Sequence, residues 1–117
     1  MPFEFPRRGE VWEVELQAGA TQRALVLSAD DINAGPAGIV IVLWITSRHM
    51  VQVLHVEVRP QESGLAQTSY VQCDEIQTVK KSRLKRHVGT LTKEKMWEIE
   101  ERLQLILDLP LFKDRRR

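Results

Sequence analysis

The sequence contains few of the residues that build disulfides, metal centres and membrane spans. Cys73 is the only cysteine among 117 residues, which excludes an intramolecular disulfide and fits a reducing compartment. No cysteine–histidine cluster has zinc-site spacing, so we expect no metal and no other cofactor. No apolar run reaches the length of a membrane span, and the first six residues are too acidic and proline-rich for a signal peptide. We therefore expect a cytoplasmic protein.

An excess of charge of one sign is also missing. The chain has 17 basic and 16 acidic residues, which leave a formal net charge of +1. Bulk charge of this size does not hold a protein to nucleic acid, so any RNA must bind in a local groove. The 43% of hydrophobic residues is enough for a buried core. We expect a single domain over residues 1–117, with a core at about 7–109 and a tail at 110–117.

Short strand-like segments fill most of the chain. Near the N-terminus, Trp12, Val14 and Leu16 alternate with acidic residues, which predicts a half-buried strand with these three on one face. The run at 39–46 is apolar on both faces and rich in β-branched residues, which predicts the central strand. Polar loops separate the strands. The predicted strands cover residues 10–16, 23–28, 39–46, 51–58, 69–76 and 87–91.

The spacing of the apolar residues changes near the C-terminus. After Thr92, a suitable N-cap, they recur at helical spacing as far as Leu109, and Pro110 ends the pattern. Several short strands followed by one helix predict a mainly β fold. The expected form is a small, partly open antiparallel barrel with a C-terminal amphipathic helix.

Two polar residues lie where predicted strands meet loops. Arg23 opens the second strand and Thr46 closes the central one, and such strand ends commonly carry functional groups. The position alone is a weak signal. An arginine there is usually a solvated rim residue, and a threonine usually satisfies backbone groups.

Longer stretches resemble the MazF/PemK family of toxins. Residues 8–12, Arg-Gly-Glu-Val-Trp, are similar to the family's opening Arg-Gly-Asp-(Val/Ile)-aromatic element. Residues 22–28 resemble its Arg-Pro-(Ala/Val)-Leu-Val-(Ile/Leu)-Ser strand, and 44–47 resemble Pro-Ile-Thr-Ser. Residues 55–58 match a family strand, and 64–84 resemble the run from Gly-Leu to Lys-Ser-Arg-Leu. The order and spacing of these elements make the resemblance specific.

The resemblance extends from Arg7 to about Leu109 and implies both a fold and an activity. The implied fold is an SH3-like barrel, usually a homodimer, in a bacterial toxin–antitoxin system. The implied activity is metal-independent, sequence-specific cleavage of single-stranded RNA, which leaves 2′,3′-cyclic phosphate and 5′-hydroxyl ends. The implied inhibitor is a cognate antitoxin, a partly disordered acidic chain. The family's catalytic arginine and threonine carry over onto Arg23 and Thr46.

Both residue types suit attack by the neighbouring 2′-hydroxyl. The reaction passes through a pentacoordinate phosphorus with extra negative charge, which preorganised donors stabilise. The forked guanidinium of Arg23 matches phosphate oxygens, and the Thr46 hydroxyl can hold one of them. Because an arginine rarely gives up its proton, Arg23 is expected to stabilise charge and the base stays open. His49 is the nearest candidate base, although a loop histidine is usually only solvated; His55 is expected to be structural.

Further residues are candidates for holding RNA. Trp44 shares strand parity with Thr46, and it either stacks on a base or packs in the core. Asp74 and Glu75 stand where the family has an acidic residue and a glutamine that contact RNA; the alternative is a solvated strand end. The full set of candidate substrate-binding residues is Gln22, Trp44, Ser47, Arg48, Asp74, Glu75 and Arg83.

Three other features affect the expected function. A basic run is either a solvated face or a surface for phosphate or antitoxin; it comprises Lys80, Lys81, Arg83, Lys85 and Arg86. The loop at 17–22 is several residues shorter than usual in the family, which puts the cut sequence and the mode of inhibition in doubt. Ala24 replaces the proline that follows the catalytic arginine.

Two alternative functions remain open on the sequence. One is a binding toxin of the same fold, like the CcdB gyrase poisons, which needs no catalytic pair. The other is an SH3-like interaction module or an inactive relative kept for antitoxin binding. The presence of both Arg23 and Thr46 favours the ribonuclease.

Overall fold

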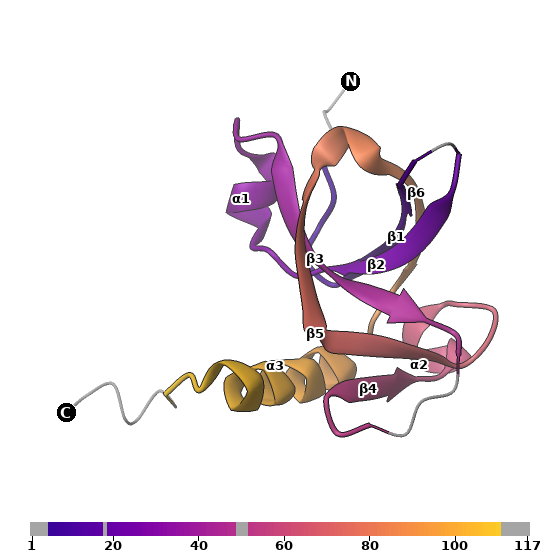
Figure 1. The fold of residues 1–117 in the computed structure, drawn as a ribbon, viewed down its shortest axis with the longest axis vertical. Helices are drawn as coiled ribbons and strands as arrows, with labels where there is room; N and C mark the ends of the chain where they lie inside the picture. The colour runs from indigo at the N-terminus through magenta and orange to yellow at the C-terminus, as the bar shows by residue number, and fades with distance from the viewer. Residues whose placement is uncertain (1–4, 18, 49–51, 111–117) are drawn as a thin grey trace.

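The strands of the computed structural model form one curled antiparallel sheet (Figure 1). The structure describes residues 5–17, 19–48 and 52–110, and within them six strands pair in the order β4-β5-β3-β2-β1-β6. The strands are β1 (Glu10–Glu15), β2 (Thr21–Val26), β3 (Ile39–Thr46), β4 (His55–Val58), β5 (Ser69–Lys80) and β6 (Leu84–Thr90). Since β4 and β6 stand at opposite ends of this order, the sheet is not closed. The predicted mainly β fold is confirmed.

In the part of the chain that the structure describes, three helices and one 3-10 turn connect and cover the strands. They are α1 (Asp30–Ala34), α2 (Pro60–Ser63), the turn η1 (Lys81–Arg83) and α3 (Lys93–Leu107). The two shortest helices lie in segments predicted as loops, because one turn of helix leaves no periodic pattern to detect. Within the described part of the chain, no helix is long and apolar enough to cross a membrane.

The predicted central strand is confirmed, while several strand ends were wrong. β3 lies between β5 and β2, with the bounds expected from its apolar run. The strand predicted at 51–58 begins only at His55, after a turn; its first residue lies outside the described residues. β5 continues to Lys80 because it pairs with β3 as far as Ile39, and β6 starts at Leu84.

The long strand β5 turns a corner in its middle. Leu43 of β3 pairs with Ile76, whereas Ile45 pairs with Val71, so an advance of two residues along β3 corresponds to five along β5. Such an irregularity bends the strand that carries the extra residues. Figure 1 shows β5 changing direction there, between the part that lies between β4 and β3 and the part that pairs with β3 alone. One strand therefore serves both halves of the sheet.

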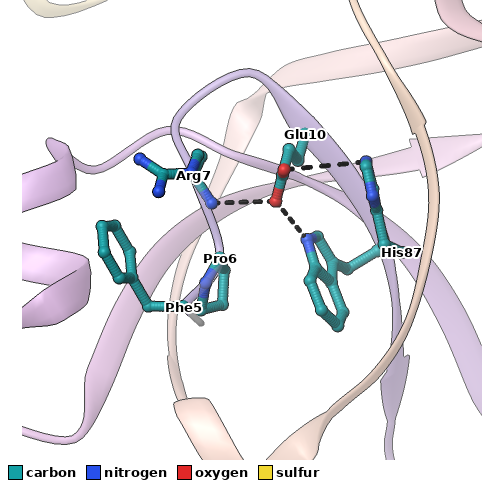
Figure 2. Close-up of a pocket in the computed structure, with 6 residues that line it drawn as sticks. Phe5, Pro6, Arg7, Glu10 and His87 are labelled. Carbon is teal, nitrogen blue, oxygen red and sulfur yellow. Dashed lines mark hydrogen bonds and ion pairs between the residues drawn. The ribbon is translucent and has the colours of Figure 1, made fainter. Parts of the chain in front are cut away.

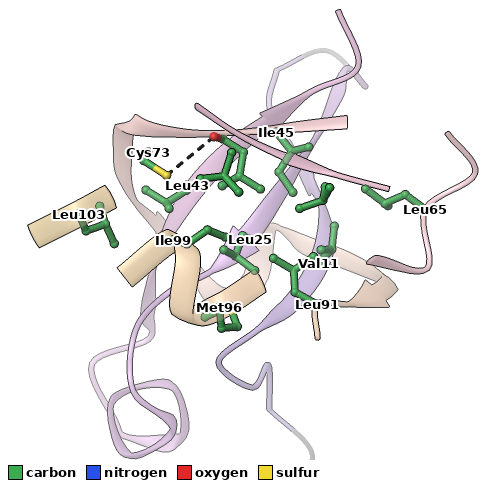
Figure 3. Close-up of a cluster of buried hydrophobic side chains, with 13 residues drawn as sticks. Val11, Leu25, Leu43, Ile45, Leu65, Cys73, Leu91, Met96, Ile99 and Leu103 are labelled. Carbon is green, nitrogen blue, oxygen red and sulfur yellow. Dashed lines mark hydrogen bonds between the residues drawn. The ribbon is translucent and has the colours of Figure 1, made fainter. Parts of the chain in front are cut away.

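One core cluster lies between the sheet and α3 (Figure 3). Met96, Ile99 and Leu103 of α3 pack against sheet residues that include Leu25 and Leu43. The Thr92 hydroxyl accepts a hydrogen bond from the Lys95 amide at 3.3 Å, which confirms the predicted N-cap. The predicted end at Leu109 was wrong, because Asp108 has a left-handed backbone (φ 54°) that ends α3 at Leu107.

A second cluster lies on the opposite face of the sheet from the α3 cluster, because Ala24 and Val26 of β2 alternate with Leu25. Val14, Val26 and Val42 belong to it, and Trp12 and Trp44 pack partly buried against it. The shared face of Trp12 and Val14 is confirmed. The expectation that the first strand is half-buried was wrong, because Val11 is buried on the other side with the α3 cluster. This packing agrees with the core role, one of the two predicted readings of Trp44, while stacking on a base stays a prediction.

Cys73 provides a test of how tightly the α3 cluster is packed. Its side chain is fully buried there, and burial raises the pKa of the thiol to about 11. We expect no reaction with a disulfide reagent such as DTNB at pH 8 in the folded protein, because the thiol stays protonated and covered. In urea one thiol per chain should react rapidly. Rapid reaction without denaturant would contradict this packing.

Candidate active site

An open pocket of about 290 Å³ lies where β2 begins and β3 ends. The antiparallel pairing of these strands, with Ala24 opposite Trp44, brings the start of one beside the end of the other. The pocket therefore collects both predicted catalytic residues and two predicted substrate-binding residues from separate segments. The lining residues are Gln22, Arg23, Ile45, Thr46, Ser47 and Ser69.

The hydroxyl of Thr46 is held by the main chain. Its Oγ1 accepts a hydrogen bond from the Arg48 amide at 3.1 Å, and the side chain is half-buried at the end of β3. A threonine hydroxyl has one hydrogen and two lone pairs. Because the amide uses a lone pair, the hydrogen of Thr46 stays free to donate to an anion in the pocket. Arg48 acts here through its backbone, while its own side chain is exposed.

Arg23 brings a positive charge to the same pocket. It is half-buried on β2, directly opposite Glu13 of β1. A planar guanidinium with forked donors beside a free hydroxyl hydrogen suits a tetrahedral or pentacoordinate phosphate. Among the described residues, no group of three or more histidine, cysteine or acidic side chains is arranged to hold a metal ion.

Ser69 is the polar lining residue that the sequence did not single out as a site residue. It begins β5, next to Tyr70, which pairs with Thr46. Its Oγ donates to the Gln67 carbonyl at 3.1 Å. Ser69 lies within the run that resembles the toxin family, but its proximity to Thr46 depends on the β3–β5 register, which no local pattern reveals.

The other candidate substrate-binding residues lie away from the pocket lining. Asp74 Oδ1 is 3.2 Å from Nε2 of His55, whose ring is buried, so this carboxylate helps to hold β4 and β5 together. Glu75 is exposed at the corner of β5. His55 thus has a structural place. His49, the candidate base, lies outside the described residues.

Much of the basic run is bonded to the chain's own fold. The Lys81 ammonium donates to two carbonyls at the end of α1. Arg83 Nη1 donates to the carbonyls of Glu15 and Leu16, at 3.2 and 2.8 Å, and so holds the end of β1. These contacts place Arg83, a predicted substrate-binding residue, outside the pocket lining. The basic run is therefore only in part a free surface.

A second pocket, of about 210 Å³, lies between the N-terminal segment and the strands β1 and β6 (Figure 2). Glu10 Oε1 accepts hydrogen bonds from the Arg7 amide and from Trp12 Nε1, both at 2.9 Å. The His87 ring stacks on Trp12, with ring centroids 5.6 Å apart. These groups satisfy one another, and none of them lines the first pocket. The first pocket is the candidate active site.

Comparison with known proteins gives a consistent set of similarities. Residues 7–107 match the family of PemK-like, MazF-like toxins of type II toxin–antitoxin systems. Endoribonuclease MazF9 of Mycobacterium tuberculosis is 30% identical over 114 residues, which cover 88% of this chain and 97% of that protein. A solved mycobacterial endoribonuclease in complex with its cognate antitoxin has a TM-score of 0.80 at 27% identity, over 91% of this chain and 98% of that one. The MazE–MazF structure from Deinococcus radiodurans (Form-II) shares the fold, with a TM-score of 0.78 at 19% identity over 92% and 100% of the two chains.

Proposed function

The chain belongs to the family of PemK-like, MazF-like toxins of type II toxin–antitoxin systems, and on this premise we propose that it cleaves single-stranded RNA with Arg23 and Thr46. It is an endoribonuclease of the toxin type. The observation that supports the proposed site is the single pocket that gathers Arg23 from the start of β2 and Thr46 from the end of β3.

The proposed reaction is transesterification within the RNA backbone. The 2′-oxygen forms a bond to phosphorus while the bond from phosphorus to the 5′-oxygen breaks. The 2′-hydroxyl gives its proton to a base, and the departing 5′-oxygen receives one. The products are a 2′,3′-cyclic phosphate and a 5′-hydroxyl. His49 remains the candidate base, and it lies outside the residues that the structure describes.

Arg23 and Thr46 act on the charge that develops in this reaction. The guanidinium donates two hydrogen bonds in one plane to the phosphate oxygens, and its charge offsets the added negative charge. The Thr46 hydrogen, left free by the Arg48 amide, donates to one non-bridging oxygen. Gln22, Ser47 and Ser69 supply polar contacts to the flanking sugar or base.

The partners belong to the same proposal. A cognate antitoxin is the protein partner, and single-stranded RNA is the substrate. A homodimer fits the large apolar side chains that this single chain leaves exposed on α3, including Trp97 and Leu105. The cytoplasm, where RNA and antitoxin meet, is the proposed location.

The test is an RNA cleavage assay in the presence and absence of EDTA. Pure protein is incubated with mixed-sequence single-stranded RNA, and the ends of the products are identified. We expect cleavage to survive EDTA unchanged and to leave cyclic phosphate and 5′-hydroxyl ends, because the site uses side-chain donors in place of a metal. Loss of cleavage in EDTA would contradict the metal-free mechanism. Intact RNA together with inhibited gyrase would favour the binding-toxin alternative.

A further inference from the structure

Three charged residues form a row across three adjacent strands. Glu13 of β1 pairs with Arg23 of β2 on one side and with Arg86 of β6 on the other. Directly paired residues project from the same face of a sheet, with Cβ atoms about 5 Å apart. The two arginines are separated by two strand spacings, about 10 Å. The row thus places a second guanidinium near the catalytic one, with a carboxylate between them.

The carboxylate of Glu13 is committed to Arg86. Arg86 Nη2 donates to Glu13 Oε2 at 2.8 Å and its Nε donates to Oε1 at 3.3 Å, so both oxygens are engaged in a forked pair. Arg86 is the more accessible partner, with 59% of its side chain exposed against 24% for Glu13. The hydrogen bond from Arg86 and the charges of Arg86 and Arg23 hold the pKa of Glu13 below its ordinary value. Glu13 is therefore ionised at neutral pH.

This pairing reduces the positive charge that RNA meets beside the pocket. With Glu13 ionised, the row carries a net charge of +1 in place of the +2 of its two arginines. Attraction to phosphates does not depend on base sequence, and it grows with each cation that an RNA backbone can reach. A weaker phosphate attraction leaves more of the binding energy to contacts with bases.

We propose that the Glu13–Arg86 pair sets the net charge beside Arg23 and thereby limits how tightly the site holds RNA of any sequence. Glu13 is then a specificity-determining residue that needs no contact with the reacting atoms. The positive charge of Arg86 is offset by Glu13 and becomes available to RNA only when Glu13 loses its charge. This inference rests on RNA being the substrate of the Arg23 pocket.

The proposal is tested by a double-mutant cycle that removes the charges of Glu13 and Arg86, here called the charge cycle, in a variant that does not cleave RNA. In Thr46→Ala protein, the Kd for a fluorescent mixed-sequence single-stranded RNA is measured at several salt concentrations. Glu13→Gln should tighten binding about threefold to tenfold and steepen the dependence of log Kd on log salt by about one. Arg86→Gln should weaken binding by a similar factor, and the double variant should return close to the Thr46→Ala parent.

The opposite signs separate this role from a structural one. Both single variants break the same ion pair, so a purely structural pair would change binding in the same direction, or not at all. Glu15→Gln is the matched control. Glu15 is also on β1 and forms an ion pair with a basic residue, Lys85, but on β2 it lies opposite the uncharged Thr21. Its effect should stay below twofold. Changes of equal sign in the two single variants, no change in either, or an equal effect of Glu15→Gln would overturn the proposal.

The charge cycle and the RNA cleavage assay together distinguish this inference from the proposed function. If the wild-type protein cleaves no RNA while the charge cycle gives opposite signs, the cleavage proposal fails and the charge proposal stands for a binding site. If RNA is cleaved while neither Glu13→Gln nor Arg86→Gln changes the Kd for RNA, only the charge proposal fails.

Discussion

Replacing Arg23 by alanine is expected to lower kcat for RNA cleavage by at least about 10²- to 10³-fold, the loss seen when one preorganised donor to a developing negative charge is removed. The loss should appear mainly in kcat, because the guanidinium meets more negative charge in the pentacoordinate state than in the substrate. Arg23→Lys should recover only part of the rate, since an ammonium keeps the charge without the planar fork. The measurement is single-turnover cleavage of a mapped RNA site.

Thr46 gives a matched set on the other side of the pocket. Thr46→Val keeps the shape and removes the hydroxyl, so it should lose about 10²-fold in rate. Thr46→Ser keeps the hydrogen that the Arg48 amide leaves free and should stay within about tenfold of the wild type. Unchanged thermal melting would show that the variants are folded. Full activity in Arg23→Ala or Thr46→Val would remove these residues from the mechanism.

The largest effect on stability is expected from Gly89→Ala. A Cβ at Gly89 would lie 2.1 Å from the backbone oxygen of Ser63, a distance that real Cβ atoms do not adopt. Because all the clashing atoms are main-chain atoms of Ser63 and Gly64, at the end of α2, no side-chain rotation relieves the clash. We expect a loss of about 3 kcal/mol in the free energy of unfolding, at the upper end of overpacking costs. Urea denaturation at fixed protein concentration measures it.

Gly19→Ala serves as the comparison for that measurement. Nothing lies within 4 Å of a Cβ at Gly19, so its cost comes only from the positive φ of 83° and should be about 1 kcal/mol. A Gly89→Ala protein as stable as Gly19→Ala would show that α2 can move away from β6 freely.

Sequence patterns predicted the parts of the fold that have a clear period. The strand at 39–46 was predictable because it is apolar on both faces. The helix after Thr92 was predictable because its apolar residues form one stripe. The length of β5 did not follow, because several residues in its second half are exposed and give no apolar alternation. The burial of Val11 depends on α3 covering that face of the sheet, which is a tertiary effect.

The candidate site was predictable to a different degree. Arg23 and Thr46 stand out only through the family resemblance, since their positions at strand ends are ordinary. Ser69 requires the register between β3 and β5. Whether Arg83 and Arg86 face RNA or the chain itself is decided by partners that lie far away in sequence. Arg83 donates to the main-chain carbonyl of Leu16, and Arg86 donates to the carboxylate of Glu13. Composition and charge runs do not contain that information.

The hydrogen bond from the Arg48 amide to Thr46 has a consequence for how such a toxin can diversify. An amide hydrogen is present in every residue except proline, so the orientation of the Thr46 hydroxyl is insensitive to which side chain occupies position 48. In the proposed mechanism, substitutions there can alter contacts with the flanking nucleotides while the hydroxyl proposed to bind phosphate stays in place. If the proposed mechanism holds, the preferred RNA sequence can change through position 48 while the orientation of the Thr46 hydroxyl is kept.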